Sequence, residues 1–185
     1  MPRTPRVTRD RVPEPLRAAF DAETASSGGV VASGPGAVML DSPEMRRRAN
    51  HLVNSLRDAS TLPKNIQALA MLVTARAMDC QGIWNAHAAR GRCESLRDAV
   101  VDALRDKRPQ PSMPADEAAV VRYGTALFTT HKVSQATLQA APAQFGAQEL
   151  TELTPLMGSY ALLAFNANAF EIDLPAQRTE PVLPM

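Results

Sequence analysis

The stretch Ile66-Gln-Ala-Leu-Ala-Met-Leu-Val-Thr-Ala-Arg-Ala77 carries apolar side chains on nearly every side of a helix. A helix that is hydrophobic all round is one that the rest of the protein covers. The preceding Thr61-Leu62-Pro63 marks its start, because proline is favoured at the first position of a helix. We therefore expect residues 63–77 to form a central buried helix around which the other elements pack.

The segment that follows, Asp79-Cys-Gln-Gly-Ile-Trp-Asn-Ala-His87, concentrates side chains with chemical functions. It either continues the central helix or follows a bend. If it is helical, Cys80, Trp84 and His87 share one face, because residues three and four apart on a helix are neighbours. A thiol, an indole and an imidazole aimed into one space predict the lining of a small-molecule site.

Most of the remaining chain also carries helical patterns. Ser42-Pro43-Glu44 combines a capping residue, a first-turn proline and an acid, and Ser95 to Asp98 resembles a capping box. Further helices are expected at 13–25, 42–59, 95–107, 115–130, 134–145 and 149–170. We expect an all-α fold: a single domain of about seven helices over residues 13–174, with a flexible N-terminal arm at 1–12 and an extended tail at 175–185.

The composition supports a helical protein and excludes several classes of function. Apolar residues make up 45% of the chain but aromatic residues only 4%, so Ala, Leu, Val and Met supply the core. The net charge of +1, with both signs interspersed, offers no basic surface for a phosphate backbone, so we expect no nucleic-acid partner. The sequence shows no membrane-spanning run and no secretory signal pattern, so we expect no membrane association and a cytoplasmic location.

The cysteines and histidines form no recognisable disulfide or metal pattern. A helix between Cys80 and Cys93 would hold the two thiols too far apart for a disulfide. The three histidines, at 51, 87 and 131, are scattered, and no group has zinc-like spacing. We therefore expect two reduced thiols, no metal site and no cofactor.

Several short motifs occur in an order that resembles the carboxymuconolactone decarboxylase family, which shares its fold with alkylhydroperoxidase D-like proteins. The motifs are Ser42-Pro43 after a Gly-Pro turn, Leu62-Pro63 leading into Leu69–Ala75, Trp84-x-x-His87, Thr130-His131-x-Val133-Ser134, and Gly158-x-Tyr160 leading to Asn168-x-Phe170. The resemblance covers about residues 34–174. It implies a helical subunit that assembles into trimers or hexamers with sites near subunit contacts, and a role in the degradation of aromatic compounds.

The chain departs from this family at two positions. Members usually carry Glu directly before the Trp and often another Glu near the start of the central helix, where this chain has Ile83 and Ala68. The thiol peroxidase relatives use a Cys-x-x-Cys pair, of which Cys80 matches the first cysteine and Ile83 replaces the second. Without the second thiol a disulfide cycle cannot close at this site, so a thiol peroxidase is the less expected function.

The resemblance makes His87 the candidate for proton transfer, because an imidazole titrates near neutrality. With Ile83 in place of a carboxylate, the imidazole should stay neutral and suit a base or a hydrogen-bond donor. The alternative is a structural histidine that bonds to backbone in a helix interface.

Five further side chains are candidates for the same site. Arg76, one turn before Cys80, would bind a substrate carboxylate. Cys80 is either a nucleophile or an inert core thiol, and Trp84 either stacks on a planar ligand or packs a subunit contact. His131 matches a family position but also suits a helix end, and Tyr160 is either a substrate-binding or a core residue.

The run Arg46-Arg47-Arg48 either attracts anionic substrates or forms a solvated helix face.

Together these readings predict a cofactor-free lyase or isomerase that acts on a small carboxylated lactone or oxo-acid by His-mediated proton transfer, as a homo-oligomer. The alternatives are a non-catalytic oligomeric binding protein on the same fold and, less expected, a thiol peroxidase.

Overall fold

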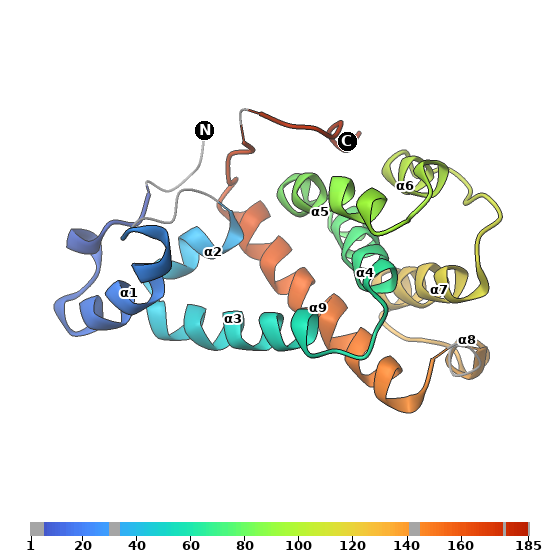
Figure 1. Cartoon of the computed structure of the whole chain (residues 1–185), viewed down its shortest axis with the longest axis horizontal. Helices are drawn as coiled ribbons and strands as arrows, with labels where there is room; N and C mark the ends of the chain where they lie inside the picture. The colour runs from blue at the N-terminus through green and yellow to red at the C-terminus, as the bar shows by residue number, and fades with distance from the viewer. Residues whose placement is uncertain (1–5, 30–33, 141–144, 176, 185) are drawn as a thin grey trace.

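The computed structural model describes residues 6–29, 34–140, 145–175 and 177–184, and within these ranges every regular element is helical (Figure 1). The α-helices are α1 (Arg17–Thr24), α2 (Pro35–Val38), α3 (Pro43–Asp58), α4 (Lys64–Ala77), α5 (Gln81–Cys93), α6 (Asp98–Arg105), α7 (Ala115–Thr130), α8 (Gln135–Ala140) and α9 (Ala147–Ala169). The all-α prediction is confirmed. The expected number of about seven helices was too low, partly because α2, only four residues long, gives no periodic signal.

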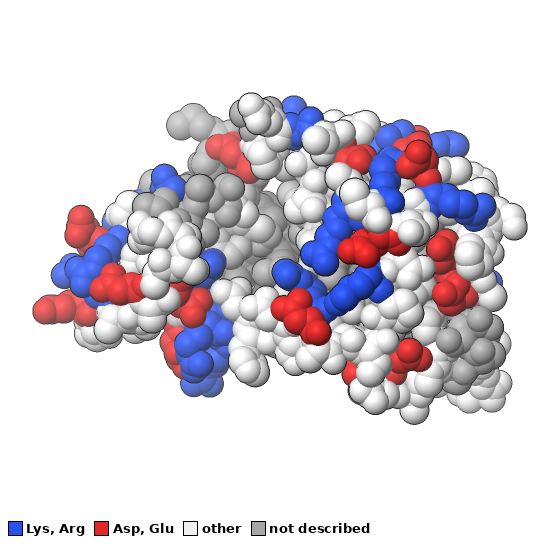
Figure 2. Space-filling model, viewed as in Figure 1, with Lys and Arg blue, Asp and Glu red and all other residues white. Residues whose placement is uncertain are grey.

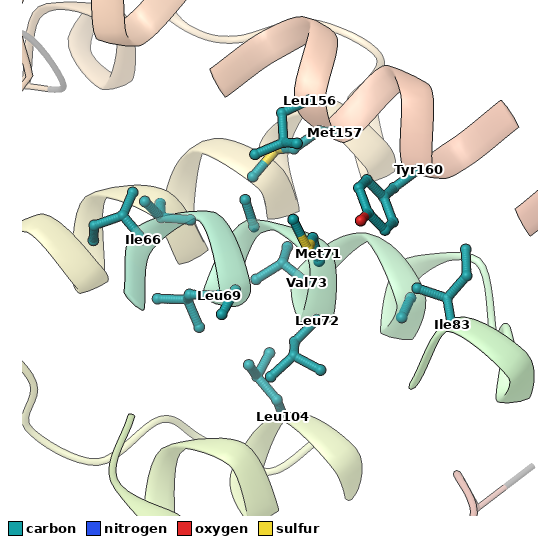
Figure 3. Packing of buried hydrophobic residues seen from close by; sticks show 14 of the residues in the cluster. Ile66, Leu69, Met71, Leu72, Val73, Ile83, Leu104, Leu156, Met157 and Tyr160 are labelled. Atoms are coloured by element: carbon teal, nitrogen blue, oxygen red, sulfur yellow. The ribbon is translucent and has the colours of Figure 1, made fainter. Parts of the chain in front are cut away.

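Helix α4 is the centre of the molecule, as its sequence predicted. Residues 66–76 are all buried, and α4 packs against α5, α7 and α9. Figure 3 shows Leu72 pointing toward Leu104 of α6, whereas Met71 points toward Tyr160 of α9. Burying one such leucine contributes about 1.5–3 kcal/mol, so a helix that is covered on all sides anchors the whole fold.

A sharp turn separates α4 from α5. Asp79 has a positive φ of 47°, and Cys80 is the extended residue that precedes α5, with φ −89° and ψ 98°. The segment therefore follows a bend and does not continue α4. Trp84 and His87 share α5, but Cys80 lies outside the helix, so the prediction of one common helical face for all three residues was wrong.

The expected helix ends were right in some places and wrong in others. Helix α7 has the predicted bounds, and Ser134 caps α8 by accepting a hydrogen bond from the backbone N–H of Thr137 at 3.1 Å. Ser95, in contrast, has a φ of 72° and lies outside α6, which begins at Asp98. Helix α8 ends at Ala140, so Phe145 is not part of it, and residues 141–144 lie outside the described residues.

The segment before α1 packs onto a small apolar cluster of its own. Within the expected arm at 1–12, the described residues 6–12 include Val7 and Val12, which are buried with Phe20 and Leu40. Arg9 also forms an ion pair with Asp21 of α1 at 2.8 Å. The described part of the arm is thus held against α1, at the left of Figure 1.

The C-terminal tail runs back along α5 without forming a helix in its described residues (Figure 1). The side-chain amide of Gln81 donates to the carbonyl of Leu183 and accepts from its N–H, both at 2.8 Å. Leu183 is only 1% exposed, and Glu180 forms an ion pair with Arg92 at 3.1 Å. Leu183 thus joins the hydrophobic core beside α5. None of the described helices is long and apolar enough to cross a membrane.

Candidate functional site

A cavity of about 290 Å³ lies where α2, α3, α5 and α9 meet. Figure 2 shows a hollow on this face, between the N-terminal helices and the body of the molecule. The lining residues are Gly34, Pro35, Gly36, Arg46, Asn50, Val53, Asn54, Arg57, Gly82, Ile83, Ala86, His87, Tyr160 and Leu163. The cavity therefore combines a polar wall from α3 with an imidazole from α5 and a phenol from α9.

The polar wall follows from the helical spacing of α3. Arg46, Asn50, Val53 and Arg57 are separated by steps of four, three and four residues, which places them on one face of a helix. The same rule brings Ile83 and His87 of α5 to one side. Each helix thus presents its own part of the lining, and the packing of the helices brings the parts together.

His87 and Tyr160 contact each other in the wall of the cavity. Their ring centres are 5.1 Å apart and their planes meet at 80°, an edge-to-face arrangement. The Nδ1 atom of His87 is buried and has no hydrogen-bond partner in the described part of the chain. A buried polar atom without a partner is costly, so this nitrogen is suited to bond a ligand.

The electrostatics of the cavity keep His87 neutral. Burial, together with the positive charges of Arg57 and Arg90, lowers the pKa of His87 to about 4. The pKa of Tyr160 is raised, because burial outweighs the opposing effect of Arg57. A neutral imidazole agrees with the expectation drawn from Ile83, but the charges of Arg57 and Arg90 are a cause that the sequence did not reveal.

The two arginines of the cavity differ in their partners. Arg46 forms an ion pair with Glu23 of α1 at 3.4 Å and donates to the carbonyl of Gly36. Arg57 forms no ion pair with any described carboxylate, and its Nε is buried without a hydrogen-bond partner in the same ranges. Nε of Arg46 is likewise without a hydrogen-bond partner among the described residues, and Arg57 bonds to the hydroxyl of Tyr160. The difference is one of charge: a carboxylate accompanies Arg46, whereas no described carboxylate offsets Arg57, so Arg57 is the better cation for an anionic ligand.

The structure brings together only two of the six site residues expected from the sequence, His87 and Tyr160. Trp84 and Cys80 are 1% and 0% exposed in the hydrophobic core and do not line the cavity. Arg76 lines a different cavity and is bonded to Asp79 at 2.7 Å. His131 is an exposed residue at the end of α7, with φ 58°, and lines neither cavity.

Sequence reasoning missed the contribution of α3. The run Arg46-Arg47-Arg48 was read as one surface, but its members diverge because successive helical residues point in different directions. Arg47 and Arg48 are exposed and pair with Glu44, whereas Arg46 turns into the cavity. The helical spacing of Arg46, Asn50, Val53 and Arg57 was the sequence signal that could have predicted this polar wall.

Cys80 stands at the beginning of α5 in an apolar environment. Burial raises the pKa of its thiol, although hydrogen bonds from the backbone N–H groups of Ile83 and Gly82 oppose this effect. Cys93, at the other end of α5, is exposed. No group of His, Cys, Asp and Glu in the described residues is arranged to hold a metal ion.

Comparisons with known proteins identify the fold. No family model matches the sequence, and no curated protein matches it either. One similar solved structure is an uncharacterized peroxidase-related protein from Ralstonia eutropha JMP134, described as an alkylhydroperoxidase AhpD core. It superposes with a TM-score of 0.73 at 17% sequence identity, and the match covers 95% of this chain and 93% of that chain.

Two further structures agree. An uncharacterized peroxidase-related protein from Silicibacter sp. TM1040 gives a TM-score of 0.68 at 15% identity, covering 90% of this chain and 88% of that one. A protein of unknown function from Agrobacterium tumefaciens, provisionally described as the antioxidant defence protein AhpD, gives 0.64 at 18% identity, covering 76% and 97%. The chain has the AhpD-like fold, which carboxymuconolactone decarboxylase-like proteins share.

Proposed function

We propose that this protein is a cofactor-free lyase or isomerase of the carboxymuconolactone decarboxylase-like type, acting on a small carboxylated lactone or oxo-acid. The observation that carries the proposal is the common cavity of a neutral His87, the hydroxyl-bearing Tyr160 and the cation Arg57, which forms no ion pair with the carboxylates of the described residues. The cavity volume of about 290 Å³ lies at the lower end of the range for small-molecule sites, which favours a compact substrate.

Each of the three side chains has a chemical role in this proposal. Arg57 binds a carboxylate that stays on the product, because a guanidinium donates two parallel hydrogen bonds to a carboxylate. The bound anion offsets the positive charge that lowers the pKa of His87, so the imidazole becomes more basic when the substrate is present. Tyr160 keeps its proton because its pKa is raised, and its hydroxyl donates a hydrogen bond to a developing enolate oxygen.

Both reaction types use the same proton carrier. In a decarboxylation, the bond to a second carboxylate breaks, CO₂ leaves, and the electron pair enters the conjugated carbonyl as an enolate. His87, which takes up a proton from solvent when the substrate anion binds, delivers that proton to the enolate carbon. In an isomerisation, neutral His87 removes a proton from one carbon and returns it to another. A positioned acid or base contributes about 10²–10⁴-fold to such a step.

The structural neighbours support a second candidate, a thiol peroxidase. Two of them are called peroxidase-related, and Cys80 directly precedes α5, where backbone N–H groups approach its sulfur. In that reaction the thiolate of Cys80 would attack one peroxide oxygen, the O–O bond would break, and water or an alcohol would leave as the thiol becomes a sulfenic acid. Two external thiols would have to reduce the sulfenic acid, forming a disulfide and water. The buried, weakly acidic thiol favours the first candidate.

We also propose that the protein is a homo-oligomer, a trimer or hexamer. Large apolar side chains are exposed on two packed helices, Met45 and Leu52 of α3 and Leu162 and Phe165 of α9. Phe165 is 64% exposed, and uncovered apolar side chains of this size often mark contact surfaces. A monomeric mass by light scattering at micromolar concentration would contradict this proposal.

The proposed reaction is tested by screening carboxylated lactones and oxo-acids for turnover, with His87→Gln as the first variant. We expect His87→Gln to lower kcat by at least about 100-fold. Arg57→Gln should mainly raise KM, whereas Arg48→Gln, on the exposed side of the same helix, should change neither constant. Binding without turnover would instead identify a non-catalytic binding protein, and peroxide turnover that is lost in Cys80→Ala would identify the peroxidase.

A further inference from the structure

A second cavity, of about 600 Å³, lies between α4, α6 and α7. It shares no lining residue with the cavity of His87. Its apolar wall includes Val73 of α4, Leu104 of α6, and Val121 and Phe128 of α7. The volume is in the range of cavities that bind organic molecules of moderate size, and the lining from three helices makes the shape part of the fold.

Arg76 lines this cavity, and one of its three nitrogens has no hydrogen-bond partner in the described part of the chain. Arg76 is only 7% exposed. One terminal nitrogen of its guanidinium donates a hydrogen bond to Asp79 at 2.7 Å, and the other donates to the carbonyl of Pro184 at 3.1 Å. Its Nε is buried without a hydrogen-bond partner in the described part of the chain. A buried charged donor without an acceptor is unfavourable, so a ligand atom that accepts this hydrogen bond gains from it.

The polar side of the cavity is positively charged. Lys107 and Arg108 line it with Arg76, and no carboxylate is among its lining residues. Asp79 pairs with both Arg76 and Lys107, and Asp106 pairs with Arg108 at 3.2 Å, so the cations are partly neutralised from outside the cavity. The three cations of the lining thus face only two carboxylates, and one of these, Asp106, also pairs with Arg105. The net positive charge that remains attracts an anion to the cavity.

We propose that this cavity is a second ligand site, separate from that of His87, for a monocarboxylate with an aliphatic or aryl body. The carboxylate accepts from Nε of Arg76 and lies near Lys107, and the apolar body packs between Leu104, Val121 and Phe128. A ligand that is polar throughout does not match the apolar wall, and a neutral hydrocarbon leaves Nε of Arg76 without an acceptor.

The test is isothermal titration calorimetry of the whole protein with sodium octanoate below its micelle concentration. We expect octanoate to bind one site per chain, and octan-1-ol, which lacks the charge, to bind at least about tenfold more weakly. Thr125→Trp places a large ring at the cavity wall and should weaken octanoate binding by at least about tenfold. Thr151→Trp, at an exposed helical threonine that lines neither cavity, is the matched control.

The charge contribution is tested with paired variants. Arg76→Gln should weaken octanoate binding, and the double variant Lys107→Gln, Arg108→Gln should weaken it several-fold and reduce its salt dependence. The control is Arg47→Gln, Arg48→Gln, which removes another adjacent pair of exposed cations, on α3. Because Arg76 also holds Asp79 and the tail, Thr125→Trp keeps the test decisive if Arg76→Gln does not fold.

The same titrations separate this site from the proposed active site. Octanoate binding should be unchanged in His87→Gln, because His87 lines only the other cavity. The proposal is overturned if octanoate does not bind the wild-type protein, if Thr125→Trp leaves its binding intact, or if its binding is lost in His87→Gln. Equal affinity for octan-1-ol would show an apolar cavity without anion recognition and would also overturn it.

Discussion

The imidazole of His87 meets the ring of Tyr160 edge to face, with the ring centres 5.1 Å apart. The two residues come from α5 and α9, and this contact fixes the histidine at the wall of the cavity. It places a proton carrier beside a hydroxyl donor. Arg57 of α3 acts on both rings, because its charge helps to lower the pKa of His87 and opposes the rise that burial causes in the pKa of Tyr160.

The depressed pKa of His87 predicts a loss of stability in acid. The unfolded chain binds a proton on His87 near its ordinary pKa of 6.5, whereas the folded protein binds it only near pH 4. The neutral form therefore stabilises the folded state above about pH 6.5, and this contribution is lost as the pH falls toward 4. The shift corresponds to about 3 kcal/mol at most.

This prediction is measured by urea unfolding of the wild type and His87→Gln at pH 7.5 and pH 4.5. Lowering the pH should shift the difference in unfolding free energy in favour of the variant, which has no imidazole to protonate. A constant difference, or an NMR titration of His87 with a midpoint near 6.5, would contradict the buried neutral imidazole.

Anion binding at Arg57 should be coupled to proton uptake by His87. Succinate in the cavity offsets the charge of Arg57 and raises the pKa of His87, so at pH 5.5 the complex takes up protons that the free protein does not hold. Calorimetry in two buffers of different ionisation enthalpy measures this uptake. It should disappear at pH 8.5 and be reduced in Arg57→Gln but not in Arg48→Gln. If succinate binds at pH 5.5 without proton uptake, the charge at Arg57 does not influence the protonation of His87, and the prediction is wrong.

The two cysteines should differ strongly in reactivity. Cys93 is exposed, whereas Cys80 is buried and its thiol pKa is raised, so a thiol reagent should label one cysteine in the native protein and two after unfolding. The two residues are at opposite ends of α5, about 20 Å apart at 1.5 Å per residue, so peroxide should produce no disulfide within a chain. Mass spectrometry under non-reducing conditions checks both points. Rapid oxidation of Cys80 in the native protein would favour the peroxidase.

Two glycine-to-alanine substitutions should have opposite effects on stability. A Cβ at Gly124 of α7 would lie 2.6 Å from Cγ1 of Val73 and 2.9 Å from Cε of Met157, so Gly124→Ala should destabilise the protein by about 1–3 kcal/mol. A Cβ at Gly158 of α9 meets nothing within 4 Å among the described residues, and Gly158→Ala should stabilise the helix by about 0.4–1 kcal/mol. Urea midpoints of both variants test the pair. A tolerated Gly124→Ala would mean that α4 and α7 are less closely packed than the structure shows.

The sequence allowed much of the fold to be predicted because the relevant signals are local. The apolar residues on all sides of 66–77 indicated a buried helix, and a helix buried on all sides is what the structure contains. The bounds of α7 followed from its periodicity between the proline-rich segment 109–114 and the capping residue Ser134. The turn at Asp79 was harder to place, because a positive φ at a non-glycine residue has no clear signature in one sequence.

The candidate site was only partly predictable. His87 and Tyr160 were both named from the sequence, but nothing local showed that they touch each other. Arg76 was assigned to the site of His87 because it precedes Cys80 by one turn. The turn between α4 and α5 breaks that helical relation, and Arg76 lines the other cavity instead.

The sequence by itself thus determined the helical class, the central position of α4 and the side chains that share a face of each helix, since these depend on periodicity within one segment. Only the tertiary structure decided that Arg57, His87 and Tyr160 line one cavity and that Arg76 lines another. A helical pattern states which residues point in the same direction, but the packing of one helix against the next decides what they point at.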